Sequence, residues 1–136
     1  MKIGGNLGIA WLSMTIAFAI HIFDEAKNDF LPLYNAMARI SGTFPVFTFS
    51  EWLTSLIVIV VILFAMTIFA FRNKKWMCYL SYFYALVLII HGGGHLALSI
   101  YFKEPSVGLY SSFLLLITAL YLISKAWRTL RFSKQE

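Results

Sequence analysis

Four long stretches of this chain consist mainly of apolar residues: 6–26, 50–71, 76–101 and 106–127. Each is close to the length of about 20 residues that an α-helix needs to span the hydrocarbon core of a bilayer. In lipid every backbone polar group must be bonded inside the protein, which a helix achieves along its own length. We therefore expect an all-α fold, an integral membrane four-helix up-down bundle that forms a single transmembrane domain over residues 1–136.

The composition agrees with a membrane protein. Hydrophobic residues make up 60% and charged residues only 12% of the 136 residues. The net charge of +5 would suggest a nucleic-acid partner in a soluble protein. Here the basic residues flank apolar runs, so no nucleic-acid partner is expected. Cys78 stands alone, which excludes an internal disulfide and a cysteine-based metal cage. Lys2 and the apolar run after it imitate a signal peptide, but no small-residue cleavage site precedes His21, so we expect a retained helix.

The Lys and Arg residues are distributed unevenly about the four expected helices. Eight fall on one side of an up-down bundle and three on the other. The eight are Lys2, Arg72, Lys74, Lys75, Lys125, Arg128, Arg131 and Lys134, and the three are Lys27, Arg39 and Lys103. Because cytoplasmic loops carry the excess of basic residues, both termini are expected in the cytoplasm. In a prokaryote this would be the cytoplasmic membrane. Aromatic belts are expected at the two interfaces, with Trp11, Trp76 and Trp127 inside and Trp52 outside.

The connection between the first two apolar runs is too long for a simple turn. Within it, Pro32 can open a short helix that continues to Arg39 and carries Leu33, Met37 and Ile40 on one side. We expect an interfacial or re-entrant segment over the mouth of the bundle, with the aromatic residues of 44–49 as a lid. An ordered loop resting on the lipid headgroups is the alternative.

Six ionisable residues are expected in the outer half of this bundle: His21, Asp24, Glu25, Glu51, His91 and His95. Two pairs of them, His21 with Glu25 and His91 with His95, have the i,i+4 spacing that places side chains on one helix face. Ionisable residues inside membrane helices are costly enough to indicate a functional site. The sequence therefore predicts that residues from three separate helices meet near the outer rim.

A metal ion would explain why these groups gather. Three carboxylates and three imidazoles cannot all stay ionised in a low-dielectric interior without compensation. A divalent cation supplies it, and imidazole with carboxylate ligands suits zinc first and iron second. The predicted metal ligands are His21, Glu25, His91 and His95. Glycines 92–94 remove side-chain bulk, so another helix or a substrate can approach. A metal-free acid/base network and plain packing are the alternatives.

The chain resembles the HXXEE-motif family of small multi-helix membrane proteins, which is named for His-x-x-Glu-Glu in the first helix. The motif stands here as His21-Ile22-Phe23-Asp24-Glu25, with Asp in place of the first Glu. The family also carries a later histidine followed by a Tyr-x-Pro-Gly-like turn, to which His95 with Tyr101, Pro105 and Gly108 is similar but stretched. The resemblance covers most of the chain by layout. It implies that His21, Asp24 and Glu25 form the functional stretch and names no reaction.

These features predict a metal-dependent membrane enzyme that acts on a lipid or another amphiphile. The reaction is expected to be hydrolytic with zinc and oxidative with a di-iron centre. Glu51 or Asp24 is the expected general base, although Glu51 also fits a first-turn acid and Asp24 a solvated or ligand-orienting one. The residues expected to orient the headgroup are Ser106, Tyr110, Ser111 and Ser112.

Three other functions are compatible with the same residues. A small transporter, proton- or cation-coupled and built as a homo-oligomer such as a dimer, would use the carboxylates and imidazoles as a relay. A site to one side of the bilayer midplane argues against it. A haem-binding bundle would use His21 with His91 or His95 as axial ligands, but the acids beside His21 argue against that. A structural or partner-binding role remains if no ion binds.

Overall fold

Within residues 6–132, which the computed structural model describes, the chain forms five α-helices. Four are long: α1 (Asn6–Lys27), α3 (Phe49–Phe71), α4 (Lys75–Phe102) and α5 (Leu109–Phe132). The fifth, α2 (Phe30–Ser41), is short. The four long helices are long and apolar enough to cross a membrane, which confirms the all-α prediction and the number of candidate spans. Lys2 and Lys134, which enter the predicted charge count, lie outside the described residues.

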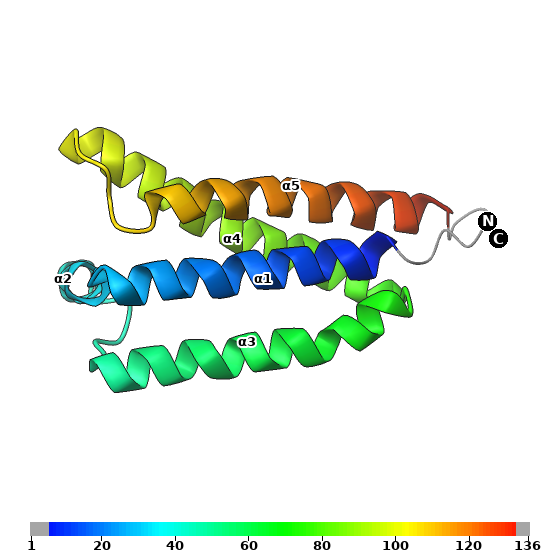
Figure 1. Cartoon of the computed structure of the whole chain (residues 1–136), viewed down its shortest axis with the longest axis horizontal. Helices are drawn as coiled ribbons and strands as arrows, with labels where there is room; N and C mark the ends of the chain where they lie inside the picture. The colour runs from blue at the N-terminus through cyan, green and yellow to red at the C-terminus, as the bar shows by residue number, and fades with distance from the viewer. Residues whose placement is uncertain (1–5, 133–136) are drawn as a thin grey trace.

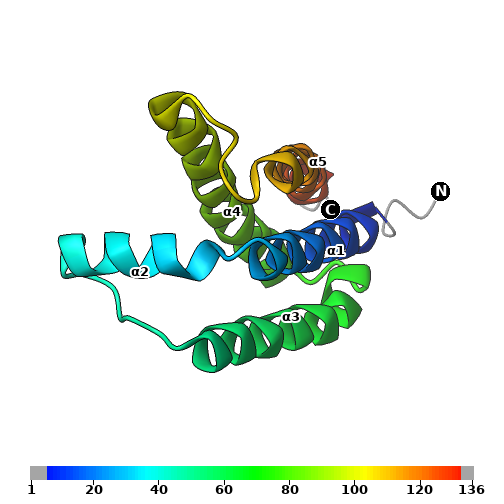
Figure 2. The ribbon, with the colours of Figure 1, turned by 60° about the vertical axis from the view of Figure 1, so that its left-hand side comes forward.

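Consecutive long helices run in opposite directions (Figure 1). α1 lies between α3 on one side and α5 and α4 on the other (Figure 2). This position makes α1 the central helix: half of its most apolar segment is buried, against 11% for α3. α3 packs mainly on α1, so most of its apolar surface faces outward. The bundle is therefore organised around α1, the helix that carries the His21–Glu25 pair.

Trp11 holds α1 against two of its neighbours. Its indole N–H donates a hydrogen bond to the Leu63 carbonyl of α3 at 2.9 Å, and its ring packs against Tyr84 of α4 with centroids 5.0 Å apart. The ring is fully buried, and Trp52 is only 6% exposed. The sequence places both residues in interfacial aromatic belts, but in the structure they fill contacts between helices.

The short helix in the α1–α3 connection is confirmed, and it extends two residues beyond the predicted range at each end. It projects sideways from the bundle, at the end opposite to the termini (Figure 2). The buried side chains of α2 are Phe30, Leu31 and Ala38. Ile40, from the predicted apolar side, is 87% exposed. Phe30 and Leu31 instead pack with Trp52 in a small second core, which ties α2 to the start of α3.

The α4–α5 loop determines where α5 starts. Gly108 has a φ of +79°, so α5 begins at Leu109 rather than at Ser106, and it continues to Phe132 rather than to 127. Ser106 lies in the loop, three residues before the helix begins. Its backbone N–H donates to the Ser99 hydroxyl at 2.9 Å, and its own hydroxyl donates to the His95 carbonyl at 2.8 Å. These bonds fold the loop back over α4 and bring Gly108 to the histidines.

Candidate metal centre

His21 and Glu25 lie one turn apart on α1, on the side that faces α4. His21 is fully buried and Glu25 is 3% exposed. From α4, the buried His95 and the partly buried His91 approach the same point. Because α1 and α4 run in the same direction (Figure 1), their i,i+4 pairs meet side by side near the end of the bundle away from the termini. The predicted convergence of the three imidazoles and Glu25 is confirmed.

One carboxylate oxygen is the centre of this group. Glu25 Oε1 lies 3.3 Å from His21 Nε2, 3.2 Å from His91 Nε2 and 3.0 Å from His95 Nε2. The Nε2 atoms of His21 and His91 are 3.0 Å apart. One ligand atom from each of the four residues lies within 4.8 Å of all the others. Atoms that bind a tetrahedral zinc ion at about 2.0–2.1 Å stand about 3.3–3.4 Å from one another, so this group can hold one ion after small shifts.

A relay behind His21 determines which of its nitrogens carries the proton. The Ser111 hydroxyl donates to Asp24 Oδ2 at 2.6 Å, so its oxygen accepts from His21 Nδ1, 2.7 Å away. With the proton on Nδ1, the Nε2 lone pair points at Glu25 Oε1. Two lone pairs at 3.3 Å repel each other unless a cation or a shared proton lies near both. The relay thus prepares His21 as a metal ligand, as hydrogen bonds to the far nitrogen do in metal sites.

His95 is positioned by packing. Its ring lies against Phe30 of α2, with centroids 5.0 Å apart, and Gly108 closes over its edge. A Cβ at Gly108 would come within 3.0 Å of His21 Cε1 and 3.1 Å of His95 Cε1, so a side chain there would displace both rings. His95 Nδ1 is buried and has no hydrogen-bond partner among the described residues. Phe30 is not predictable from the sequence, because nothing there indicates that the start of α2 reaches His95.

His91 is the exposed member of the group, with 36% of its side chain accessible. The glycines after it divide into two kinds. A Cβ at Gly92 would make ordinary contact with α5, 3.5 Å from Leu116 and from the Ser112 carbonyl. A Cβ at Gly93 or Gly94 would meet nothing within 4 Å. Gly92 therefore lies against α5, and Gly94 leaves open space next to His95. Gly93, two residues from each histidine, lies on the opposite face of α4.

The other predicted site residues lie outside this group of four. Glu51 forms a capping box with Thr48 at the start of α3, and its carboxylate accepts bonds from the Thr48 N–H and hydroxyl. Asp24 also binds Asn28, at 2.9 Å, besides Ser111. Of the predicted headgroup residues, Ser106 and Ser112 donate to backbone carbonyls, and Tyr110 is 76% exposed. Ser111 orients His21, which is a different role from the predicted one.

No family model, curated protein or solved structure matches the chain. The resemblance to the HXXEE-motif family rests on residues 21–25 and on the layout of the helices. What the structure itself establishes is a buried His/Glu group that can hold a metal ion, in a small protein with four candidate membrane helices.

Proposed function

We propose that this chain is an integral membrane metalloprotein that binds one divalent ion within the group formed by His21, Glu25, His91 and His95. The observation that carries the proposal is the position of Glu25 Oε1, within 3.0–3.3 Å of three imidazole nitrogens. Both termini face the cytoplasm, and the metal centre lies toward the outer face of the membrane, as the basic residues indicate.

The ligand set favours a single ion. Di-iron bundles take carboxylates from several helices, whereas Glu25 is the only carboxylate among the four residues of this group. Three nitrogens and one oxygen suit zinc, with mononuclear iron as the second choice. A haem is disfavoured, because no macrocycle fits between His21 Nε2 and His91 Nε2 at 3.0 Å.

We further propose that the protein is a hydrolase acting on an ester or amide of a lipid or another amphiphile. A bound zinc ion would supply Lewis acidity and a water molecule with a pKa lowered to about 7. Catalytic zinc sites keep three protein ligands and one open position, whereas four ligands close the site. The buried residues His21, Glu25 and His95 would hold the ion. His91 would stand at the open side, where a substrate enters past Gly94.

In this scheme Asp24 acts through Ser111 by holding the His21 tautomer, rather than as a general base. The role of Glu51 as a general base remains a prediction, and its contacts in the structure are those of a helix cap.

The alternative function is a cation-coupled carrier. The accessible His91 beside three buried ligands favours it as the second candidate, because an ion that is to be carried needs a path in and out.

Elemental analysis of the purified protein, with and without substitutions, tests these proposals. We expect about one metal ion per chain in the wild type and a strong loss in Glu25→Gln, which removes the one negatively charged ligand among these four residues. Asp29→Asn, an exposed acid just after α1 with the same chemical change, should keep the metal. Because three ligands remain, His91→Ala should also retain the ion if the site is catalytic and lose it if all four residues are needed. A wild-type protein without metal after expression in metal-supplemented medium would refute the proposal.

A further inference from the structure

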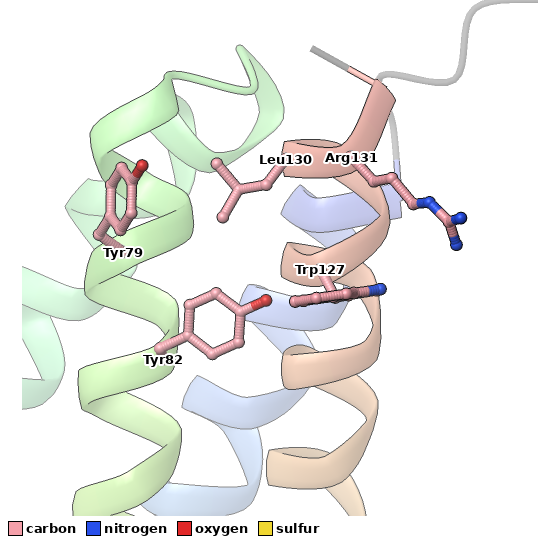
Figure 3. Close-up of a pocket in the computed structure, with 5 residues that line it drawn as sticks. All are labelled: Tyr79, Tyr82, Trp127, Leu130 and Arg131. Carbon is pink, nitrogen blue, oxygen red and sulfur yellow. The ribbon is translucent and has the colours of Figure 1, made fainter. Parts of the chain in front are cut away.

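A cavity lies at the end of the bundle opposite to the metal centre, between the start of α4 and the end of α5. Its volume is about 540 Å³, and it is lined by Tyr79, Tyr82, Trp127, Leu130 and Arg131 (Figure 3). Tyr79 and Trp127 are about 60% exposed, so the cavity opens on the lateral surface of the bundle. None of these residues belongs to the metal centre.

The Tyr82 hydroxyl is a buried polar group in the wall of this cavity. Its oxygen is buried and has no hydrogen-bond partner within residues 6–132, and in Figure 3 it points toward the Trp127 ring. A buried hydroxyl without a partner costs free energy, because it has lost its bonds to water. A bound molecule with an acceptor atom at this point would recover that cost.

The charge around the cavity favours an anion. The end of α5 carries Lys125, Arg128 and Arg131, and the α3–α4 turn at the same end carries Arg72, Lys74 and Lys75 (Figure 1). The five acids within residues 6–132 lie at the other end: Asp24, Glu25, Asp29, Glu51 and Glu104. Basic pockets between membrane helices on the cytoplasmic side bind anionic lipid headgroups.

We propose that this cavity binds the headgroup of an anionic phospholipid. When the exposed Trp127 ring swings aside, the Tyr82 hydroxyl donates to a phosphate oxygen, and Trp127 and Tyr79 pack against the glycerol and the first acyl carbons. The Arg131 guanidinium extends away from the rings in Figure 3, and a rotation of this exposed side chain brings it to the phosphate. A lipid fits better than free phosphate because most of the lining is aromatic or aliphatic. The proposal depends on membrane insertion and not on the metal centre.

Native mass spectrometry of the full chain in neutral detergent tests this lipid site. The protein is titrated with phosphatidylglycerol and with phosphatidylcholine of the same acyl chains. We expect phosphatidylglycerol to bind at least about fivefold more tightly. Tyr82→Phe should weaken its binding about tenfold by removing a hydrogen bond to a charged group, and Arg131→Gln about fivefold. Tyr101→Phe and Lys103→Gln are the matched controls from the other end of α4, and they should bind as the wild type does.

Metal content separates this proposal from the previous one, because the Tyr82 and Arg131 variants should retain the ion. Arg131 lies on the surface, so its variant reports on the site even if Tyr82→Phe impairs folding. Equal binding of the two lipids would overturn the proposal, and so would wild-type binding by Arg131→Gln. Displacement of phosphatidylglycerol by millimolar inorganic phosphate would overturn the lipid in favour of the free anion.

Discussion

Replacing Gly108 with alanine tests how closely the α4–α5 loop is fitted to the metal centre. The residue has a φ of +79°, where an L side chain costs about 1–2 kcal/mol. The new methyl group would also lie 3.0 Å from His21 Cε1 and 3.1 Å from His95 Cε1. These contacts are a few tenths of an ångström too short, so both rings must move away from Gly108. We expect a loss of stability of about 1–3 kcal/mol, and a metal affinity lowered about 10–100-fold, as when ligand orientation is disturbed.

Gly42→Ala is the matched control for this change. Gly42 has a similar φ of +62°, but a Cβ there would meet nothing within 4 Å. It should show the backbone cost, about 1–2 kcal/mol, with unchanged metal affinity. Thermal unfolding followed by circular dichroism gives the stability, and competition with a chromophoric chelator gives the affinity. Wild-type affinity in Gly108→Ala, or an equal loss in Gly42→Ala, would refute the fitted contact with the rings.

Three further outcomes are expected. Ser111→Ala removes the acceptor of His21 Nδ1 and should lower metal affinity about 10–100-fold. Ser112→Ala, whose hydroxyl donates to the Gly108 carbonyl, should leave the affinity unchanged; the same chelator competition measures both. Chelation of the metal should lower the melting temperature, because an ion present at 100 times its Kd adds about 2.7 kcal/mol to the free energy of unfolding. An unchanged melting temperature would mean that no ion is bound in the folded state. In a Cys78→Ala background, an impermeant maleimide added outside intact cells should label Glu104→Cys and not Lys74→Cys, and the reverse pattern would invert the proposed topology.

Helix geometry explains why the metal group is predictable from the sequence. The i,i+4 spacing fixes His21 with Glu25, and His91 with His95, on single faces of their helices. The up-down order then places both pairs at the same end of the bundle. These inferences need only helical periodicity and the positions of the apolar runs, and both are visible in the sequence.

The remaining features depend on how the connections dock. Phe30 reaches His95, and Ser111 reaches His21, through the placement of α2 and of the α4–α5 loop, for which no local pattern exists. The buried side of α2 could not be read from the sequence, because apolarity does not separate a core-facing residue from a lipid-facing one: the apolar Ile40 points outward. The role of Glu51 as a helix cap can be predicted from the sequence, because Thr48 and Glu51 have the spacing of a capping box.

The position of the ligands on two distant helices has a consequence for biogenesis. Seventy residues separate Glu25 from His95, so α1 leaves the ribosome long before its partners on α4 are synthesised. During that interval its buried acid and imidazole face the translocon or lipid without compensation, which disfavours release into the bilayer. Stable integration of α1 should therefore wait for α4, and a nascent chain that stops before α4 should be extracted from membranes more easily than the complete chain.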